Sequence, residues 1–346
     1  MNDFEYWQER SEQNIILTEQ LANSYNEQLA REYNKVIKSL QQQLYEFYAL
    51  YASENGLTLQ EAQKKLSSKE LKELRATIDE YIEEAQKFDS KNANKYLKNL
   101  EELQAKAKVS RLELLMAEYR HAIEMLLLQQ EVDQPNIYLE GYESSFYHTL
   151  YDIQTYSGIG ATFTRPTRDM VVAALAQKYL GQNFSDRLWQ NKEMLIYTLK
   201  KEIKQAFAAG TPAKNVAETV AKKMNTRLGV AQTLVRTEMA NVANQGNLLA
   251  YKEAGVKEYK LLATLDFKTS EICRELDGNV YLVSQAERGV NYPPFHPNCR
   301  TTTVPVVDGE SYHTRIAKKD GSYEVVKDIT YKPVSYTHLR AHETTL

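Results

Sequence analysis

The chain has 346 residues, enough for two or three domains and at least one sizeable hydrophobic core. Its 43 Lys and Arg residues nearly balance its 46 Asp and Glu residues, and the net charge of −3 argues against a polyelectrolyte that coats nucleic acid. It has no run of about 18 apolar residues, so we predict no membrane-spanning segment. Its two cysteines and the lack of a basic, apolar leader are expected of a protein made in a reducing cytosol.

The first third of the chain has the periodicity of a long amphipathic helix. Residues 4–51 contain neither Pro nor Gly, and apolar side chains recur there at steps of three and four. Because this spacing places them on one helix face, we expect them to form a core stripe. The stripe consists of Leu17, Leu21, Tyr25, Leu29, Tyr33, Ile37, Leu40, Leu44, Phe47 and Tyr51.

Further helices are predicted before the middle of the chain. Ser67 and Glu70 have the spacing of a capping box, in which each side chain satisfies a backbone N–H of the other's residue. Another helix is expected over residues 90–131, with Pro135 as its break. Long charged helices joined by short loops favour a bundle or an extended hairpin, and no catalytic constellation is present among them.

The middle third is also predicted to be helical. One helix is expected over residues 167–180, and a second begins with Ser185 as its N-cap and runs to Gly210, which is suited to end it. The last long helix is expected over about residues 225–254, with Gly255 directly after it.

The carboxyl-terminal third changes character. Residues 256–265 read as a strand, residues 271–276 as a short helix, residues 279–282 as extended chain and residues 301–304 as a further strand. The chain is therefore predicted to be mainly α, with long amino-terminal and middle helices followed by a small α+β domain.

Both cysteines of the chain lie in this last part, together with a histidine in a proline-rich loop. Cys273 supplies one segment, and His296 and Cys299 supply a second, which is the kind of ligand set that tetrahedral zinc uses. Asp266 is a candidate for the fourth ligand. The alternative is that both cysteines are small buried residues, that His296 bonds the backbone and that Asp266 caps a turn.

The order of these motifs resembles a known family. R-T-E on the last long helix is followed by D-x-x-T-S-x-x-C, by L-D-G and by P-P-x-H-P-N-C-R. This order is similar to that of the phage head-morphogenesis or minor head proteins, whose characteristic domain is named after the F protein of phage Mu. The resemblance covers about residues 140–330. The matching positions are Arg236, Thr237, Glu238, Gly255, Val256, Asp266, Thr269, Cys273, Gly278, Pro293, Pro294, His296, Pro297, Cys299 and Arg300.

The resemblance implies a structural role. Members of the family associate with the portal vertex during capsid assembly, a few copies stay inside the head, and some influence genome ejection or contact DNA. We therefore expect a minor capsid protein in the host cytoplasm during assembly and then in the interior of the virion head. Its expected partner is the portal protein, with scaffold or coat protein as further candidates. Many members carry Cys where this chain has Ser270 and Thr301, so half of the thiolates available to a zinc site are absent here.

Two other function classes are left open. A DNA-binding internal head protein would use basic clusters such as 200–204 and 222–223, although exposed helix faces explain the same lysines. An enzyme or a toxin-associated domain would need an acid/base site. The chain has no phosphate-binding Gly-rich loop and no H-E-x-x-H motif, so we predict neither catalytic residues nor a bound cofactor other than the candidate zinc.

Four charged residues are instead predicted to serve structure. They are Arg236, Glu238, Asp266 and Arg300, and we expect one of the two carboxylates to pair with one of the two guanidinium groups beneath the cysteine segment. Such a pair would fix the long helix against the proline-rich loop.

The chain ends in two segments of different kind. Lys318 to Ser322 has the pattern of a hairpin turn between short β-prone runs. The last thirteen or so residues resemble translated sequencing-adapter sequence, so His338 and His342 are not interpreted as a metal pair. The predicted division is 1–135 as an amino-terminal helical arm or bundle, 136–232 as a middle helical region, 233–310 as the Mu F-like domain, 311–333 as a hairpin tail and 334–346 as a non-native tail.

Overall fold

The computed structural model describes residues 3–51, 58–158, 163, 165–178, 181–264, 266, 268–306, 314–319 and 322–327. It divides into two compact units, each assembled from separate segments of the chain. We call residues 1–26, 134–187 and 233–346 the sheet unit, and residues 27–133 and 188–232 the helical unit. Each unit combines segments from distant parts of the sequence.

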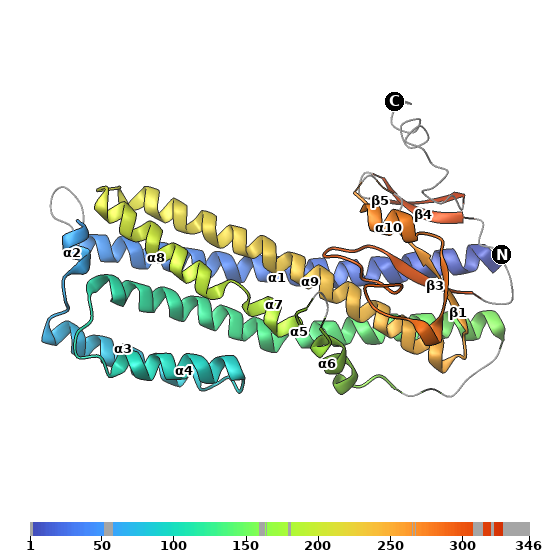
Figure 1. The fold of residues 1–346 in the computed structure, drawn as a ribbon, viewed down its shortest axis with the longest axis horizontal. Coiled ribbons are helices and arrows are strands. Elements are labelled where there is room, and N and C mark those ends of the chain that lie inside the picture. The colour runs from blue at the N-terminus through green and yellow to red at the C-terminus, as the bar shows by residue number, and fades with distance from the viewer. Residues whose placement is uncertain are drawn as a thin grey trace, which may run out of the picture. The chain divides into compact units, whose positions relative to one another are not determined.

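Helices make up most of the described chain (Figure 1). They are α1 (Asp3–Tyr51), α2 (Leu59–Gln63), α3 (Ser68–Ala85), α4 (Lys91–Gln104), α5 (Arg111–Ser157), α6 (Arg168–Ala176), α7 (Phe184–Trp189), α8 (Lys192–Ala208), α9 (Ala213–Glu253) and α10 (Glu271–Leu276). The strands are β1 (Glu258–Leu262), β2 (Val280–Leu282), β3 (Thr302–Val306), β4 (Thr314–Lys319) and β5 (Ser322–Lys327). The prediction of a mainly α chain with a small α+β part near its carboxyl end is confirmed.

The sheet unit takes its name from a three-stranded antiparallel sheet in the order β2-β1-β3. Tyr259 at the centre of β1 faces Tyr281 on one side and Pro305 on the other. Pro305 lies on β3, an edge strand of this sheet, where a residue without an N–H is tolerated. The sheet is entered from α9 through Gly255, whose φ of 70° is the left-handed conformation that ends many helices.

A core of aromatic and sulfur-bearing side chains joins the sheet to the helices of the same unit. Tyr259 and Tyr292 are fully buried and meet edge to face, with ring centroids 5.1 Å apart. The Tyr292 hydroxyl donates to the carbonyl oxygen of Asn244 on α9 at 2.7 Å. Cys273 and Cys299 belong to this core, together with Ile153 of α5 and Leu248 and Tyr251 of α9. The strands therefore rest on a surface that α5 and α9 build.

Glycine permits a close approach of α5 and α9 in the sheet unit. A Cβ atom on Gly246 of α9 would lie 2.5 Å from the carbonyl oxygen of Tyr142 on α5. The backbones are therefore closer there than any larger residue at that position allows.

The helical unit buries the predicted apolar stripe of α1. Tyr33, Leu40 and Leu44 are fully buried, and Leu40 offers its carbonyl oxygen to the Tyr119 hydroxyl of α5 at 2.8 Å. The pair α3 and α4 has a core of its own, in which Ile78 and Tyr96 are among the buried side chains. The core stripe of the first helix is thus confirmed over the part that lies in this unit.

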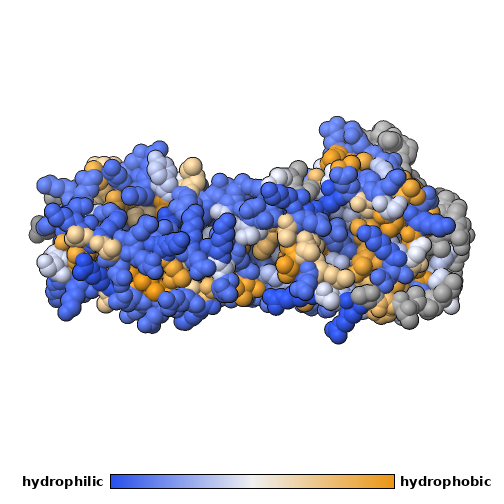
Figure 2. Space-filling view, turned by 60° about the horizontal axis from the view of Figure 1, so that its bottom comes forward, coloured by the Kyte–Doolittle hydropathy of each residue, from blue (hydrophilic) through white to orange (hydrophobic). Residues whose placement is uncertain are grey.

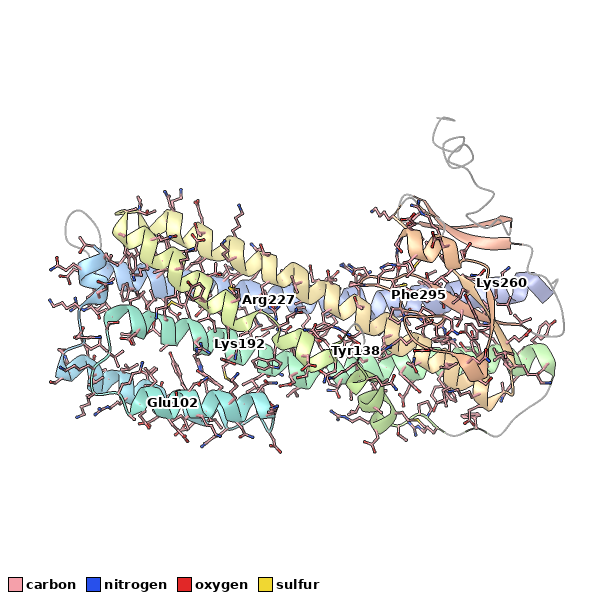
Figure 3. The ribbon with its side chains drawn as sticks, in the orientation of Figure 1. Glu102, Tyr138, Lys192, Arg227, Lys260 and Phe295 are labelled. Carbon is pink, nitrogen blue, oxygen red and sulfur yellow. The ribbon has the colours of Figure 1, made fainter. Side chains whose placement is uncertain are left out.

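A buried ionic cluster lies among α5 and α8 of the helical unit. The Lys192 ammonium contacts Glu124 Oε1 at 2.6 Å, and both side chains are almost fully buried. Arg120 holds Glu193 through two hydrogen bonds of 2.9 and 2.7 Å. Figure 3 labels Lys192 on α8 and Arg227 on α9, and the Arg227 guanidinium donates to the carbonyl oxygen of Leu188. No sequence motif predicts this cluster, because its members lie far apart along the chain.

Pro135 does not end a helix, contrary to the prediction. Helix α5 continues through it from Arg111 to Ser157. Proline removes a backbone hydrogen bond and costs about 3 kcal/mol inside a helix. Gln134 and Tyr138 beside it are both fully buried. Tertiary packing around the proline outweighs its local penalty.

The segment predicted as one helix over residues 90–131 is two helices. The Ser90 hydroxyl caps α4 by accepting from the N–H of Ala93. Ser110 then opens α5, because its hydroxyl accepts from the N–H of Glu113 while the Glu113 carboxylate accepts from the N–H of Ser110. This capping box in the sequence S-R-L-E was overlooked.

The predicted N-cap at Ser185 is also wrong. Asn183 takes that role for α7, since its side chain accepts from the N–H of Asp186 at 2.8 Å and the Asp186 carboxylate accepts from the N–H of Asn183 at 3.2 Å. The helix expected to run on to Gly210 is interrupted at Asn191, whose φ of 63° is left-handed. Gly210 itself follows the C-cap residue of α8, Ala209, and has a φ of 65°, as predicted for a terminating glycine.

The carboxyl-terminal hairpin is present as predicted. Strands β4 and β5 pair antiparallel, with Lys319 opposite Ser322. The predicted adapter-like tail, residues 334–346, lies outside the described residues. No helix in the described part of the chain is both long and apolar enough to cross a lipid bilayer. On the face drawn in Figure 2, hydrophilic side chains predominate and apolar ones form separate small areas.

Candidate functional site

The candidate site lies where α10 meets the proline-rich loop of the sheet unit. The Ser270 hydroxyl caps α10 by accepting from the N–H of Cys273, which places Cys273 in the first turn with its side chain buried. The loop reaches His296 after a cis bond between Pro293 and Pro294. Asn298 then adopts a left-handed φ of 57°, and its N–H donates to the Thr237 hydroxyl of α9 at 3.0 Å. The chain returns from this turn to Cys299.

The structure brings Cys273, His296 and Cys299 together. Their ligand atoms all lie within 4.8 Å of one another. The two sulfur atoms are 3.7 Å apart, and His296 Nε2 is 3.1 Å from the sulfur of Cys273. Both cysteines are free thiols, and each is less than 5% exposed. Three side chains from two chain segments therefore converge on one point.

The pKa values of the two thiols are shifted in opposite directions. Hydrogen bonding from Cys273 lowers the pKa of the Cys299 thiol, and His296 and backbone N–H groups act in the same direction against burial. The same contact with Cys299 raises the pKa of Cys273, and burial adds to that increase. Hydrogen bonding to Cys299 also raises the pKa of His296. A cluster of this kind favours one thiolate at Cys299, stabilised by its two neighbours.

Asp266 is not placed as a fourth ligand of this cluster. Its carboxylate forms a bidentate pair with Arg300, in which Nη2 lies 2.7 Å from Oδ1 and Nη1 contacts Oδ2. It also accepts from the N–H of Lys268 at 2.9 Å and from the Thr269 hydroxyl at 3.0 Å. Burial alone would raise the pKa of Asp266, but the hydrogen bonds and charge of Arg300 outweigh it and lower that pKa. Asp266 thus fixes the turn before α10.

The predicted charged network is divided between two places. Asp266 and Arg300 are paired, whereas Glu238 on α9 bonds Arg187 of α7 instead of either predicted arginine. Glu238 is 2% exposed, and burial raises its pKa although the Arg187 charge opposes the increase. Arg236 lies on the exposed side of α9. Arginine and glutamate two residues apart point to different helix faces, so their separation follows from helix geometry.

The sequence patterns did not predict the polar residues that extend the pair of Glu238 and Arg187. Asn241 donates to Glu238 Oε2 at 3.2 Å and accepts from Arg288 at 2.8 Å. Arg288 lies in the loop after β2, and it also donates to the carbonyl oxygen of Gln177. The only usable signal was a glutamate and an asparagine three residues apart on one helix face, which is common on exposed helices as well.

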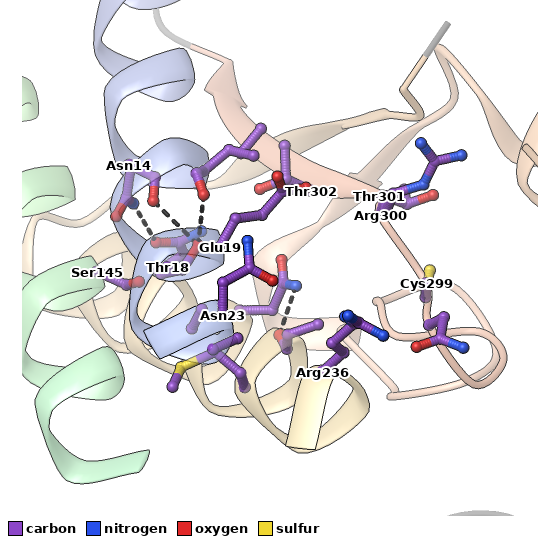
Figure 4. Close-up of a pocket in the computed structure, with 18 of the residues that line it drawn as sticks. Asn14, Thr18, Glu19, Asn23, Ser145, Arg236, Cys299, Arg300, Thr301 and Thr302 are labelled. Atoms are coloured by element: carbon purple, nitrogen blue, oxygen red, sulfur yellow. Dashed lines mark hydrogen bonds between the residues drawn. The ribbon is translucent and has the colours of Figure 1, made fainter. Parts of the chain in front are cut away.

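A larger pocket of about 550 Å³ lies in the sheet unit, next to the cysteine cluster (Figure 4). Residues of α1 and α9 and the segment 298–302 line it. Among its described lining residues the basic side chains are Arg236, Lys268 and Arg300, whereas Glu19 is the acidic one. The pocket thus offers amides, hydroxyls and positive charge, but no convergent pair of carboxylates for acid/base catalysis.

The fold and the site define a class of protein that is mainly helical, with a small carboxyl-terminal sheet and a cysteine-bearing loop. Comparison with known proteins agrees with this class. Residues 197–304 match the family described as phage Mu protein F like protein. That range contains most of α8, all of α9, the three-stranded sheet apart from its last residues, and the whole cysteine cluster. The family resemblance predicted from the sequence is confirmed.

Residues 197–304 are thus similar to the Mu F-like family, and most of the chain is similar to a phage minor head protein. It is 29% identical over 293 residues to the minor head protein GP7 of Bacillus phage SPP1, a match that covers 77% of this chain and 88% of that protein. It is also 24% identical over 216 residues to the NAD(+)–arginine ADP-ribosyltransferase EFV of Enterococcus faecalis, which covers 58% of this chain and 44% of that protein. No solved structure matches the chain.

Proposed function

We propose that this protein is a minor structural component of a phage head, that it binds the portal protein during head assembly, and that it stays inside the finished head. The similarity to a minor head protein carries this proposal, because it extends over 77% of this chain and 88% of the relative. Assembly would take place in the host cytoplasm. From inside the head the protein would be placed to assist DNA packaging or ejection. Scaffold or coat protein would be its secondary contact.

The composition of the chain supports a protein partner. Its net charge is −3, so it has no overall attraction to a nucleic acid backbone. Its 24 tyrosines combine apolar area with a polar tip, which is a common property of protein interfaces. Tyr197 and Met194, one helical turn apart on α8, are 63% and 61% exposed.

The direct test is co-expression with the portal protein encoded by the same phage genome. We expect the two proteins to elute together in size-exclusion chromatography, at a fixed ratio and at physiological salt. A portal protein from an unrelated phage is the matched control and should elute separately. If the chain is folded by circular dichroism yet elutes apart from its own portal protein, the proposal is wrong.

A second candidate function is enzymatic, because one relative is named as an ADP-ribosyltransferase. We infer a non-catalytic role, since the match to that protein covers 44% of its length and the pocket of this chain is short of carboxylates. Labelled NAD⁺ with an arginine-rich acceptor protein provides the test, and we expect no transfer of label. If label is transferred, Glu19→Gln should abolish the transfer and Glu27→Gln, an exposed position on α1, should not.

The DNA-binding alternative depends on the lysines of α8 and α9. Lys223 is paired with Glu202 at 3.4 Å, so part of this positive charge is already compensated. We expect weak binding of duplex DNA at physiological salt. Tight binding that falls steeply as salt rises would favour the alternative, because each neutralised phosphate adds to that slope.

A further inference from the structure

We propose that Cys273, His296 and Cys299 bind a zinc ion that fastens α10 to the proline-rich loop. Nothing in the proposed role at the portal requires this site, so the two proposals can fail separately. The inference depends on the spacing of the ligand atoms, the anchoring of the imidazole ring and a small cavity beside the cluster.

The distance between the two sulfur atoms already matches that of a tetrahedral site, and the distance from His296 to Cys273 is near it. With zinc–sulfur bonds of about 2.3 Å and zinc–nitrogen bonds of about 2.1 Å, two sulfur ligands lie about 3.8 Å apart, and a sulfur and a nitrogen lie about 3.6 Å apart. The sulfur atoms of Cys273 and Cys299 are 3.7 Å apart, and His296 Nε2 is 3.1 Å from the Cys273 sulfur. The Cys273–His296 pair would open by about 0.5 Å to reach this geometry, and the Cys299 sulfur lies within 4.8 Å of the imidazole.

The imidazole of His296 is held in the orientation that a metal ligand needs. Its Nδ1 lies 2.8 Å from the carbonyl oxygen of Pro297, and a carbonyl can only accept a hydrogen bond. The proton of the neutral ring is therefore on Nδ1, and the lone pair of Nε2 faces the sulfur of Cys273. A backbone carbonyl in this position is the usual outer partner of a zinc-bound histidine.

A cavity adjoins the cluster on the side of Cys273 and His296. Its volume is about 20 Å³, and Ser270, Thr301 and Asn298 also line it. That is room for one water molecule or one ion. The Ser270 hydroxyl lies 2.8 Å from His296 Nε2. The fourth position of the zinc ion therefore falls to a water molecule or to this hydroxyl.

The ligand chemistry selects zinc over harder cations. Two thiolates and one imidazole suit a borderline-soft ion, whereas magnesium and calcium require oxygen ligands. Binding would release the thiol protons to solvent, so that two thiolates neutralise the charge of the ion. Asp266, the predicted fourth ligand, is committed to Arg300. The bond set would join the six-residue helix α10 to the proline-rich loop.

The test measures the zinc content of the full chain. The protein is produced in cells grown with zinc and is purified in the presence of a reductant that contains no metal. We expect about one zinc per chain by elemental analysis, and a thiolate charge-transfer band after cobalt replaces zinc. Cys299→Ser and His296→Asn should lose most of the metal. His148→Asn removes an exposed histidine of α5 and should keep it. Less than a tenth of an equivalent in the native chain, or equal zinc in all variants, would overturn the proposal.

A second variant keeps the test decisive if the ligand variants do not fold. Ser270→Cys places a third thiol beside Nε2, and we expect at least a tenfold lower apparent Kd for zinc in competition with a chromophoric chelator. An unchanged Kd would contradict the assigned fourth position. Thiol counting in denaturant completes the design: a Cys273–Cys299 disulfide in freshly isolated native protein would show that the pair serves oxidation instead of metal binding.

Discussion

The pair between Asp266 and Arg300 illustrates what a single contact does in the sheet unit. Asp266 accepts from Arg300 twice and from two groups of the following turn, so its charge holds the chain between β1 and α10. Arg300 also offers its carbonyl oxygen to the Thr264 hydroxyl at 3.0 Å. The segment before the first cysteine and the segment after the second are thereby joined.

Removal of the Arg300 side chain should destabilise the sheet unit. We expect Arg300→Ala to lower the free energy of unfolding by about 1–3 kcal/mol, because a partly buried carboxylate loses two charge-assisted hydrogen bonds. Arg168→Ala, at an exposed position of α6 in the same unit, is the control and should change it by less than about 0.5 kcal/mol. Urea unfolding followed by circular dichroism measures both. An unchanged midpoint for Arg300→Ala would show that the pair is dispensable.

The pKa of Asp266 gives this pair a pH dependence of known sign. Its folded-state pKa is lowered, so the stabilisation is present above the unfolded-state pKa and is lost as pH falls through the folded-state value. Native protein should therefore lose stability on acidification below about pH 4 more steeply than Asp266→Asn does. The comparison requires unfolding curves of the two proteins over the acidic range.

The pKa shift of Asp152 has the opposite sign to that of Asp266, so its effect on the pH dependence of stability is also opposite. Burial raises its pKa to about 7, although the charge of Arg10 opposes the increase. Because the folded-state pKa exceeds the unfolded one, the contribution to stability is largest at low pH and disappears as pH rises through about 7. We expect Asp152→Asn to be more stable than native protein at pH 8 and nearly equal at about pH 3, below the unfolded-state pKa. Asp169→Asn, exposed on α6, should show no such crossover.

At the scale of helices and strands, sequence patterns predicted what depends on local chemistry. The apolar stripe of α1, the glycine after α8 and the short helix over residues 271–276 follow from the sequence, because each is decided within a few residues. Pro135 was misread because the cost of a proline is local whereas the packing of Tyr138 is not. The boundary at Ser110 was overlooked although its capping box is written in the sequence.

The candidate site likewise contains some contacts that the sequence predicts and others that it does not. The motif spacing identified Cys273, His296 and Cys299 correctly as neighbours, since two short segments carry all three. The partner of Glu238 could not be predicted, because Arg187 lies 51 residues away along the chain. Contacts of that range are set by how helices pack, which single-sequence patterns do not encode.

The close approach of α5 and α9 gives a prediction at this scale. Gly246→Ala would place a methyl group 2.5 Å from the carbonyl oxygen of Tyr142, so we expect a loss of about 1–3 kcal/mol in stability. Gly229→Ala lies on the same helix with no atom within 4 Å of the added Cβ. It should gain about 0.5–1 kcal/mol from helix propensity alone. Thermal unfolding of both variants measures these changes in stability. A Gly246→Ala protein that is more stable than native protein would refute the close packing of α5 and α9.

At the scale of the whole molecule, neither unit is a continuous stretch of chain. The sheet unit needs residues 1–26 and 134–187 in addition to the segment that contains the strands. The family match, residues 197–304, includes part of the helical unit and omits two segments of the sheet unit. Domain boundaries drawn along the sequence, such as 233–310, therefore describe motifs better than folding units.

A fragment of residues 197–304 should accordingly fail to unfold cooperatively. The core around Tyr259 includes Ile153 of α5, which this fragment lacks. We expect residual helix by circular dichroism, a broad thermal transition and rapid proteolysis, whereas the full chain melts sharply. A sharp melt of the fragment would show that the strands and α9 suffice.

The interleaving of segments has a consequence for biosynthesis. A ribosome finishes the last piece of the helical unit at residue 232, before it has made any strand of the sheet unit. The first 26 residues must then wait for partners that emerge much later, such as Asn247, which accepts a hydrogen bond from Asn14 across 233 positions. We therefore expect the order of translation to favour early completion of one half and to leave the other exposed to chaperones until the chain is nearly released.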